Sequence, residues 1–291
     1  MIHQPWIELQ VAMLNGSKTK SLLGRERLRL TKSQITFYLM VLWNHQIQHV
    51  RFSFLYRQAN LGTTYAGFMK NVTTVGPLMA YLFEQHKKET SIDFSSIINS
   101  IDTTLLAQKR PEFITQKDWA KGKVTIRSKN KVKTYICGQK GLVVRNRQGC
   151  IVAADLLKIN HSDFNILKNP LLWYRKGLDK GFLLADRGFN SKKVRKRFSD
   201  LKANPLLFGL PAQFCFKAKL LSPPHVKELV QLSPKERRLY KRRWKIESLF
   251  QELKDSYNPF KLDLTGARTP RLVRAKFFVS CLAYNLSKRP V

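Results

Sequence analysis

The sequence predicts an α/β protein in which a mixed sheet flanked by helices follows a helical N-terminal region. Three observations support this fold class. Residues 1–90 carry helical patterns throughout. Beyond residue 90, short apolar and β-branched runs alternate with helical patterns. The strongest helical pattern, LYKRRWKIESLFQELKDSY at 239–257, comes late in the chain and contains neither Pro nor Gly.

The N-terminal region is expected to form short helices. Thr31 or Ser33 can cap the first clear helix. Two more are predicted at 50–57 and 65–83, and the second of these is broken at Gly76–Pro77. Short helices with basic and aromatic side chains suit a module that binds DNA ends, and a plain helical bundle would have the same pattern.

A polar segment separates this region from the rest of the chain. The sequence HKKET at 86–90 interrupts the helical pattern. We therefore expect a helical N-terminal region at 1–90 and a second domain at 91–291.

The second domain opens with a predicted strand at 97–106, which is rich in apolar and β-branched residues. Asp is depleted in strands, so Asp102 inside this run needs an explanation. The non-functional explanation is that Asp102 is an exposed acid on an edge strand. A basic, polar connection follows at 107–131.

A hairpin is predicted next. Two apolar runs at 134–144 and 150–158 are separated by the turn sequence RNRQG. Asp155 lies inside the second run and is a rival to Asp102 as a functional acid. A helix is expected at 160–176, ended by glycine.

A buried strand at 181–185 then ends at Asp186. Open α/β sheets place their sites at the carboxyl ends of such strands. Ser191 can cap a very basic helix, and a short apolar run at 205–210 is a plausible last strand. Asp186 is therefore a second candidate functional acid.

Two helix starts complete the chain. Ser233–Pro234 is a favourable start for a helix that continues into 239–257. Thr269–Pro270 begins a final amphipathic helix, which we expect to pack on the second domain.

The helix at 239–257 carries a narrow polar stripe beside an apolar face. At about 100° per residue from Tyr240, Arg243, Glu247 and Lys254 fall at roughly 300°, 340° and 320°. These four residues are called the signature stripe below. The apolar face lies at roughly 180–280° and consists of Ile246, Leu249, Phe250, Leu253 and Tyr257. Glu247 is thus a carboxylate beside the core and between two cations.

Composition points to a polyanionic partner. Lys and Arg number 53 against 19 Asp and Glu, a formal net charge of +34. Such an imbalance causes self-repulsion that nucleic acid relieves. No apolar run approaches the roughly 18 residues needed to span a membrane, so an anionic membrane is the weaker alternative. The four cysteines are far apart and are expected to be reduced thiols, and no nucleotide-binding glycine loop is present.

The predicted order of strand, hairpin, helix, strand, helix, strand and helix matches the ribonuclease-H-like arrangement. In that fold, acids on the first strand, at the end of the fourth strand and on a late helix converge. Asp102, Asp186 and Glu247 occupy these places, and Asp155 would be structural. Three clustered carboxylates repel one another without cations, and their oxygen atoms favour Mg²⁺ or Mn²⁺. Two such ions can activate a water or a 3′-hydroxyl and stabilise the leaving oxygen.

The signature stripe resembles the Tyr-Arg-Glu-Lys signature of DDE-type bacterial insertion-sequence transposases. SIDTTLL at 100–106 and ADRGF at 185–189 resemble the family's first and second Asp motifs. The resemblance implies a transposase that binds transposon ends and cleaves and joins DNA strands. It implies that Asp102, Asp186 and Glu247 bind the metal ions, and that Tyr240, Arg243 and Lys254 contact DNA phosphates.

The resemblance also implies partners and a place in the cell. These are double-stranded DNA, both transposon ends and target, and at least a homodimer in the DNA complex. The protein would be a bacterial cytoplasmic protein that associates with the nucleoid when bound to DNA. Some relatives carry a large β-rich insertion between the second Asp and the Glu. Here only 60 residues intervene, which puts in doubt a hairpin intermediate that depends on the insertion.

Three alternatives stay open. A domesticated or degenerate copy would bind DNA without cutting it. A ribonuclease or a resolvase-type nuclease could share the fold. A tyrosine recombinase would use Tyr240 as a nucleophile and form a covalent adduct without metal, but the chain has no Arg-His-x-x-Arg box.

Overall fold

The structure is a computed structural model of the 291-residue chain. It describes residues 3–14, 21–23, 30–89, 98–107, 120–125, 133–159, 181–186, 189, 196, 199–200, 203, 219–221, 232–254 and 269–288. The described chain forms two compact units, which we treat separately. The first comprises residues 1–90, 108–118 and 252–291, and the second comprises 91–107 and 119–251.

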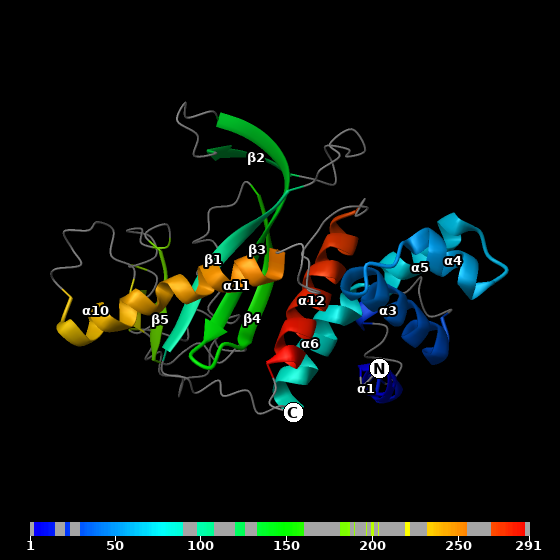
Figure 1. The fold of residues 1–291 in the computed structure, drawn as a ribbon, viewed down its shortest axis with the longest axis horizontal. Helices are drawn as coiled ribbons and strands as arrows, with labels where there is room; N and C mark the ends of the chain where they lie inside the picture. Colours follow the sequence, from blue (N-terminus) through cyan, green and yellow to red (C-terminus); the bar gives the residue numbers. More distant parts are fainter. Residues whose placement is uncertain are drawn as a thin grey trace. The chain divides into compact units, whose positions relative to one another are not determined.

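The first unit is helical (Figure 1). Its helices are α1 (His3–Ala12), α3 (Lys32–Ile47), α4 (Phe52–Ala59), α5 (Tyr65–Val75), α6 (Pro77–Glu89) and α12 (Pro270–Ser287). Thr31 caps α3 in a capping box with Gln34. The predicted break separates α5 from α6 at Gly76, where an added Cβ would lie 3.0 Å from the Cβ of Ala275 in α12. Glycine thus permits the close approach of α12 to this corner.

Helix α12 corrects one expectation. It was expected to pack on the sheet domain, but it packs mainly on α6 and α3. Almost every residue from Leu272 to Asn285 is buried. A helix buried on all sides belongs in the centre of a helical bundle, whereas one that covers a sheet needs only one apolar face. Thr269 caps α12 as predicted.

The second unit is built on a mixed six-stranded sheet (Figure 1). Its strands are β1 (Ile98–Ala107), β2 (Ala120–Thr125), β3 (Lys133–Asn146), β4 (Ile151–Lys158), β5 (Phe182–Leu184) and β6 (Lys219–Leu221). The order is β4-β3-β1-β5-β6, and β2 pairs with the first part of β3. β3 is antiparallel to β1, whereas β5 and β6 run parallel to it. This order and these directions confirm the ribonuclease-H-like α/β fold.

Two strands were not predicted. β2 lies inside the segment interpreted as a polar connection, because its sequence AKGKVT lacks an apolar alternation. β6 has only three residues and also gave no clear pattern. The strand predicted at 205–210 and the helices predicted at 160–176 and after Ser191 lie outside the described residues, apart from isolated positions. The β3–β4 hairpin is confirmed, and Gly149 closes its turn at φ 99°.

The late helix is interrupted by a tighter turn. α10 (Pro234–Tyr240) leads through the 3₁₀ turn η6 (Lys241–Arg243) into α11 (Trp244–Lys254). It starts at Ser233, as predicted, with a capping box to Glu236. The helical run crosses one face of the sheet, where η6 contacts β1 (Figure 1). The buried residues of α11 are those of the predicted apolar face, Ile246, Leu249, Phe250 and Leu253.

Candidate active site

Asp102 and Asp155 point to opposite faces of the sheet. Asp102 pairs with Val143 across β1 and β3, and Asp155 pairs with Leu142 across β3 and β4. Paired residues project to the same face, and consecutive residues of a strand project to opposite faces. Since Leu142 and Val143 are consecutive, a site on either face of the sheet can use only one of the two acids.

The register of β1 and β5 points Asp186, just past the end of β5, toward the face that Asp102 occupies. Ser100 of β1 pairs with Leu184 of the parallel strand β5. The ladder continues past β5, because the Ala185 amide donates to a β6 carbonyl at 3.1 Å. If the β1–β5 register is extended by two residues beyond Leu184, Asp186 would be level with Asp102, and neighbouring strands lie about 4.8 Å apart. Both acids are half-buried.

The 3₁₀ turn aligns the signature stripe. Residues three apart eclipse one another in a 3₁₀ helix, so Tyr240 and Arg243 project in the same direction. A uniform α-helix would separate them by about 60°. Counted onward from Arg243, Glu247 follows at about 40° and Lys254 at about 20°. The four residues therefore lie within a narrower stripe than the sequence predicted.

Electrostatic contacts join this stripe to the end of β5. Arg243 Nη2 lies 2.8 Å from Glu247 Oε1, and Arg243 also donates a hydrogen bond to the Tyr240 side chain. Burial raises the pKa of Tyr240 above 10.0; the negative charges of Asp186 and Glu247 raise it too, and Arg243 opposes them. The phenol of Tyr240 is thus close enough to Asp186 to sense its charge.

Asp186 and Glu247 lie within a segment of the chain that matches a known protein family. A family model described as "Transposase DDE domain" matches residues 94–286, more than half of the chain. The chain belongs to this transposase family. Searches of the curated proteins and of the solved structures found no match. The match runs from just before β1 to the end of α12, and so includes Asp102, Asp186 and the signature stripe.

The carboxylates of this transposase fit a hard divalent cation in their chemistry. The register of β1 and β5 directs Asp102 and Asp186 toward one face, and carboxylate oxygens are preferred ligands of Mg²⁺ and Mn²⁺. Glu247 is directed toward Arg243 and has a side chain that is 54% exposed. Among the described residues, no three His, Cys, Asp or Glu side chains form a group that could hold a metal ion. To join the two aspartates, Glu247 must exchange its Arg243 partner for metal.

Lys254 is the last residue of α11 and ends the signature stripe of the transposase directly after the buried Leu253. Desolvation by surrounding protein lowers its pKa, although the side chain keeps an exposed surface. A partly desolvated ammonium interacts strongly with an approaching phosphate, because less water must be displaced. Position and chemistry therefore agree with a phosphate contact.

One exposed side chain near the stripe was not predicted. Trp244 follows Arg243 directly and is 57% exposed, whereas the other large apolar residues of α11 are buried. The available signal was a tryptophan at a solvent-facing position of an amphipathic helix, flanked by cations. A bare aromatic surface beside cations is typical of nucleic-acid contacts.

None of the helices in the described ranges is long and apolar enough to cross a bilayer.

Proposed function

We propose that this transposase binds the ends of its element and catalyses metal-dependent DNA cleavage and strand transfer with Asp102, Asp186 and Glu247. One observation carries the proposal. The parallel register of β1 and β5 directs Asp102 and Asp186 toward one face of the sheet, and the charge of Asp186 reaches Tyr240 on the helical run that also carries Glu247. Two strands and one helix thus direct acids toward a single region.

The proposed ligands are the three carboxylates, which would hold two Mg²⁺ or Mn²⁺ ions. Bound there, the ions supply activation of the attacking water or 3′-hydroxyl and stabilise the leaving oxygen. Arg243 orients Glu247 before DNA binds, and its planar fork suits a phosphate afterwards. Lys254 supplies a second phosphate contact as a point charge.

Tyr240 serves as a hydrogen-bond donor to phosphate in this proposal. Its pKa is raised, so the phenol keeps its proton at neutral pH. A tyrosine nucleophile needs the opposite, a pKa lowered by its neighbours. The raised pKa therefore argues against the tyrosine-recombinase alternative.

The remaining assignments concern DNA and assembly. We assign end binding to the helical region 1–90, in addition to the signature residues Tyr240, Arg243 and Lys254. The DNA partners are duplex transposon ends and target. Joining two ends requires two active sites, so the working complex is a homodimer or larger. The place of action is the bacterial cytoplasm, at the nucleoid.

The proposal is tested by nicking of a linear duplex that carries the element's candidate end. Wild type is compared with Asp186→Asn and Glu247→Gln, with Mg²⁺ and with EDTA. We expect Mg²⁺-dependent nicking that both variants lose while they still bind the duplex. Binding without cleavage by wild type under both Mg²⁺ and Mn²⁺ would identify a degenerate copy. Cleavage that persists in EDTA would overturn the carboxylate–metal mechanism.

A second substrate separates a transposase from a resolvase-type nuclease. A four-way junction without element ends is offered alongside the end duplex. The transposase proposal expects preferential nicking of the end duplex. Preference for the junction would favour the resolvase alternative.

A further inference from the structure

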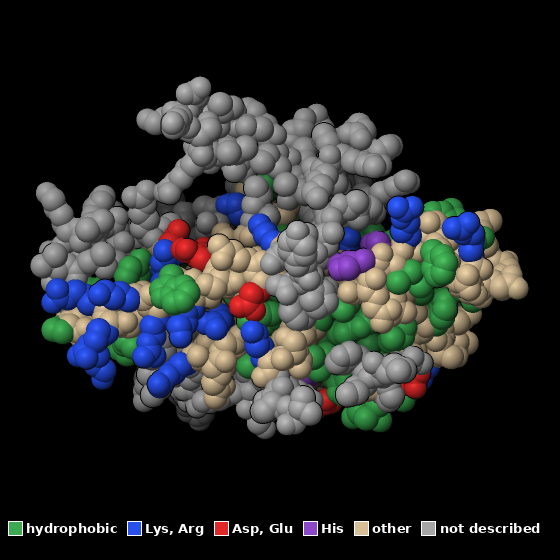
Figure 2. Space-filling view, in the orientation of Figure 1, with side chains coloured by type: hydrophobic (Ala, Val, Ile, Leu, Met, Phe, Trp, Pro, Cys, Tyr) green, Lys and Arg blue, Asp and Glu red, His purple; other side chains and the backbone are tan. Residues whose placement is uncertain are grey.

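A second cationic surface lies on the same helical run as the signature stripe. Its members are the exposed cations of α10, η6 and the first turn of α11 that share one side of the helical run, and we call them the basic face: Lys235, Arg238, Lys241, Arg242 and Lys245. Figure 2 shows Lys and Arg side chains gathered over α10 and the beginning of α11. The signature residues are not part of this set, since Tyr240 and Arg243 are half-buried and Lys254 lies at the far end of α11.

The basic face points away from the signature stripe. With Tyr240 at zero and the 3₁₀ turn taken at about 120° per residue, the five cations fall between about 120° and 240°. The signature stripe falls between about 0° and 40° on the same count. The stripe is turned toward Asp186, as the electrostatic contact with Tyr240 requires. The basic face is therefore on the opposite side of the helix from the acids.

The charge of the basic face is not neutralised within the described chain. No described carboxylate forms an ion pair with any of the five cations. Glu236 is the single acid between Lys235 and Lys245, and its carboxylate accepts from the Ser233 amide and hydroxyl at 3.0 Å each. Its role is to cap the helix. Five close positive charges remain available to an external polyanion.

We propose that the basic face binds the phosphate backbone of a second DNA duplex, the target, while the signature stripe holds the element's end. This inference rests on the proposed function. A helix with its side chains is about 10 Å thick, so the DNA strand at the acids is on the wrong side to reach the basic face. The stretch from Lys235 to Lys245 is about 15 Å long, which matches about four phosphates along one strand.

Target DNA is the occupant that the chemistry favours. Lys and Arg side chains that project into solvent recognise phosphates, which are the same in every sequence. Lys supplies three of the five cations, and Lys binds phosphate as a point charge rather than through a rigid fork. A surface of this kind suits a duplex whose sequence is not fixed in advance.

The test compares two variants that lose the same charge. The basic-face variant is Arg238→Gln, Arg242→Gln, Lys245→Gln, and Gln keeps a good helix propensity. The control variant is Lys158→Gln, Lys196→Gln, Arg271→Gln, three exposed cations outside region 1–90, the signature stripe and the basic face. A third variant, Arg238→Lys, Arg242→Lys, Lys245→Arg, keeps the charge. Circular dichroism verifies that each chain is folded.

Two readouts are taken on the full chain. The first is nicking of the end duplex. The second is capture of a labelled linear duplex of unrelated sequence by the preformed protein–end complex, measured over a range of salt concentrations. We expect the basic-face variant to nick ends at a rate close to wild type. We expect its salt slope for duplex capture to fall by about 2.7, which is about 0.9 per lost phosphate contact.

The outcomes separate this inference from the proposed function. Capture that the basic-face variant retains, with an unchanged slope, would overturn the inference while nicking still supports the transposase activity. Equal losses of end nicking and capture would assign the basic face to end binding instead and would also overturn it. If wild type does not nick the end duplex, the proposed function fails. Capture of the unrelated duplex is then compared between the free wild-type protein, the basic-face variant and the control variant. A loss of capture in the basic-face variant alone would still support DNA binding by the basic face.

Discussion

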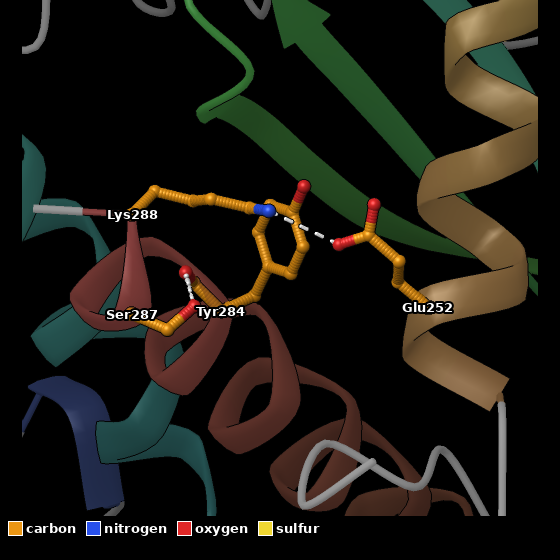
Figure 3. A network of polar contacts seen from close by, with 4 residues as sticks. All are labelled: Glu252, Tyr284, Ser287 and Lys288. Carbon is orange, nitrogen blue, oxygen red and sulfur yellow. Dashed lines mark hydrogen bonds and ion pairs between the residues drawn. The ribbon is translucent and has the colours of Figure 1, made fainter. Parts of the chain in front are cut away.

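Lys288 joins the end of α12 to Glu252 in the last turn of α11, with its Nζ 3.1 Å from Glu252 Oε2 (Figure 3). The same ammonium lies 4.8 Å from the ring centroid of the fully buried Tyr284. Desolvation on its own would lower the pKa of Lys288, but the hydrogen bond to Glu252 and the negative charge there raise it above 10.5. The pair therefore ties the end of α12 to the last turn of α11 within the first unit.

Removing either partner of this pair should lower the free energy of unfolding, by different amounts for the two partners. The side chains of Lys288 and Glu252 are 37% and 41% exposed, so Glu252→Gln should cost about 0.3–1 kcal/mol. Lys288→Ala should cost more, because the ammonium–ring contact adds about 0.5–1 kcal/mol. Urea unfolding at neutral pH measures both changes. Equal destabilisation by the two variants would show that the Tyr284 contact contributes nothing.

The pH dependence of the pair follows from its raised pKa. The folded state binds the Lys288 proton more tightly than the unfolded state, so the contribution is complete below about pH 10.5 and is lost as pH rises through the raised value. The stability difference between wild type and Lys288→Ala should thus be constant from pH 7 to pH 9 and smaller at pH 11. A difference that already shrinks between pH 7 and pH 9 would contradict this assignment.

The opposite orientation of two acids gives a prediction about cleavage. Asp102→Asn should reduce cleavage by at least about 100-fold, since in the proposed mechanism it removes an anionic ligand of the metal ions. Asp155→Asn is a matched control, because Asp155 lies on the neighbouring strand pair and points to the other face. It should leave cleavage close to wild type. A large loss in Asp155→Asn alone would place the site on the other face of the sheet.

Sequence could nominate these acids but could not place them. Asp102 and Asp155 both interrupt apolar runs, so the sequence alone does not distinguish them. The face of the sheet that each acid occupies depends on how its strand pairs with the neighbouring strands. That information is the register of β3 against β1 and β4, which depends on pairing between distant segments. The fold class was predictable because the long strands β1, β3 and β4 carry clear apolar patterns. β2 and β6 were not, because pairing with longer strands stabilises them despite weak patterns.

The 3₁₀ turn shows a second limit. The sequence KRR at Lys241–Arg243 has good α-helix propensity and gives no sign of a tighter turn. The assumption of a uniform α-helix therefore gave the signature stripe an angular width about 20° larger than the helical run with its 3₁₀ turn has. Its polar members were still identified correctly as neighbours on one side of the helix, because four-residue spacing survives so small a rotation.

Tyr240→Phe tests whether the phenol donates to DNA. The variant should bind the end duplex roughly 10- to 150-fold more weakly, since one hydrogen bond to a charged phosphate contributes about 1.5–3 kcal/mol. Cleavage should persist, because Tyr240 is not a nucleophile in the proposed mechanism. Fluorescence anisotropy and nicking measure the two effects. A covalent protein–DNA adduct in wild type that is absent from Tyr240→Phe would contradict the proposal.

The raised pKa of Tyr240 also predicts a flat pH profile for this contribution. The phenol keeps its proton beyond pH 10.0, so the affinity difference between wild type and Tyr240→Phe should not change between pH 7 and pH 9. Loss of the difference within this range would mean that the phenol ionises early and that its surroundings are not those described.

Arg243 opposes the charges of Asp186 and Glu247 at Tyr240, so its removal should raise the pKa of Tyr240 further. Arg243→Gln deletes the cation, whereas Arg243→Lys keeps a charge without the planar fork that reaches both Tyr240 and Glu247. NMR titration of ¹³C-labelled tyrosine, with Tyr240→Phe to assign the signal, should give the highest pKa for Arg243→Gln and an intermediate one for Arg243→Lys. A pKa that falls or stays constant in Arg243→Gln would show that the guanidinium does not contact the phenol, and would remove Arg243 as the link between Tyr240 and Glu247.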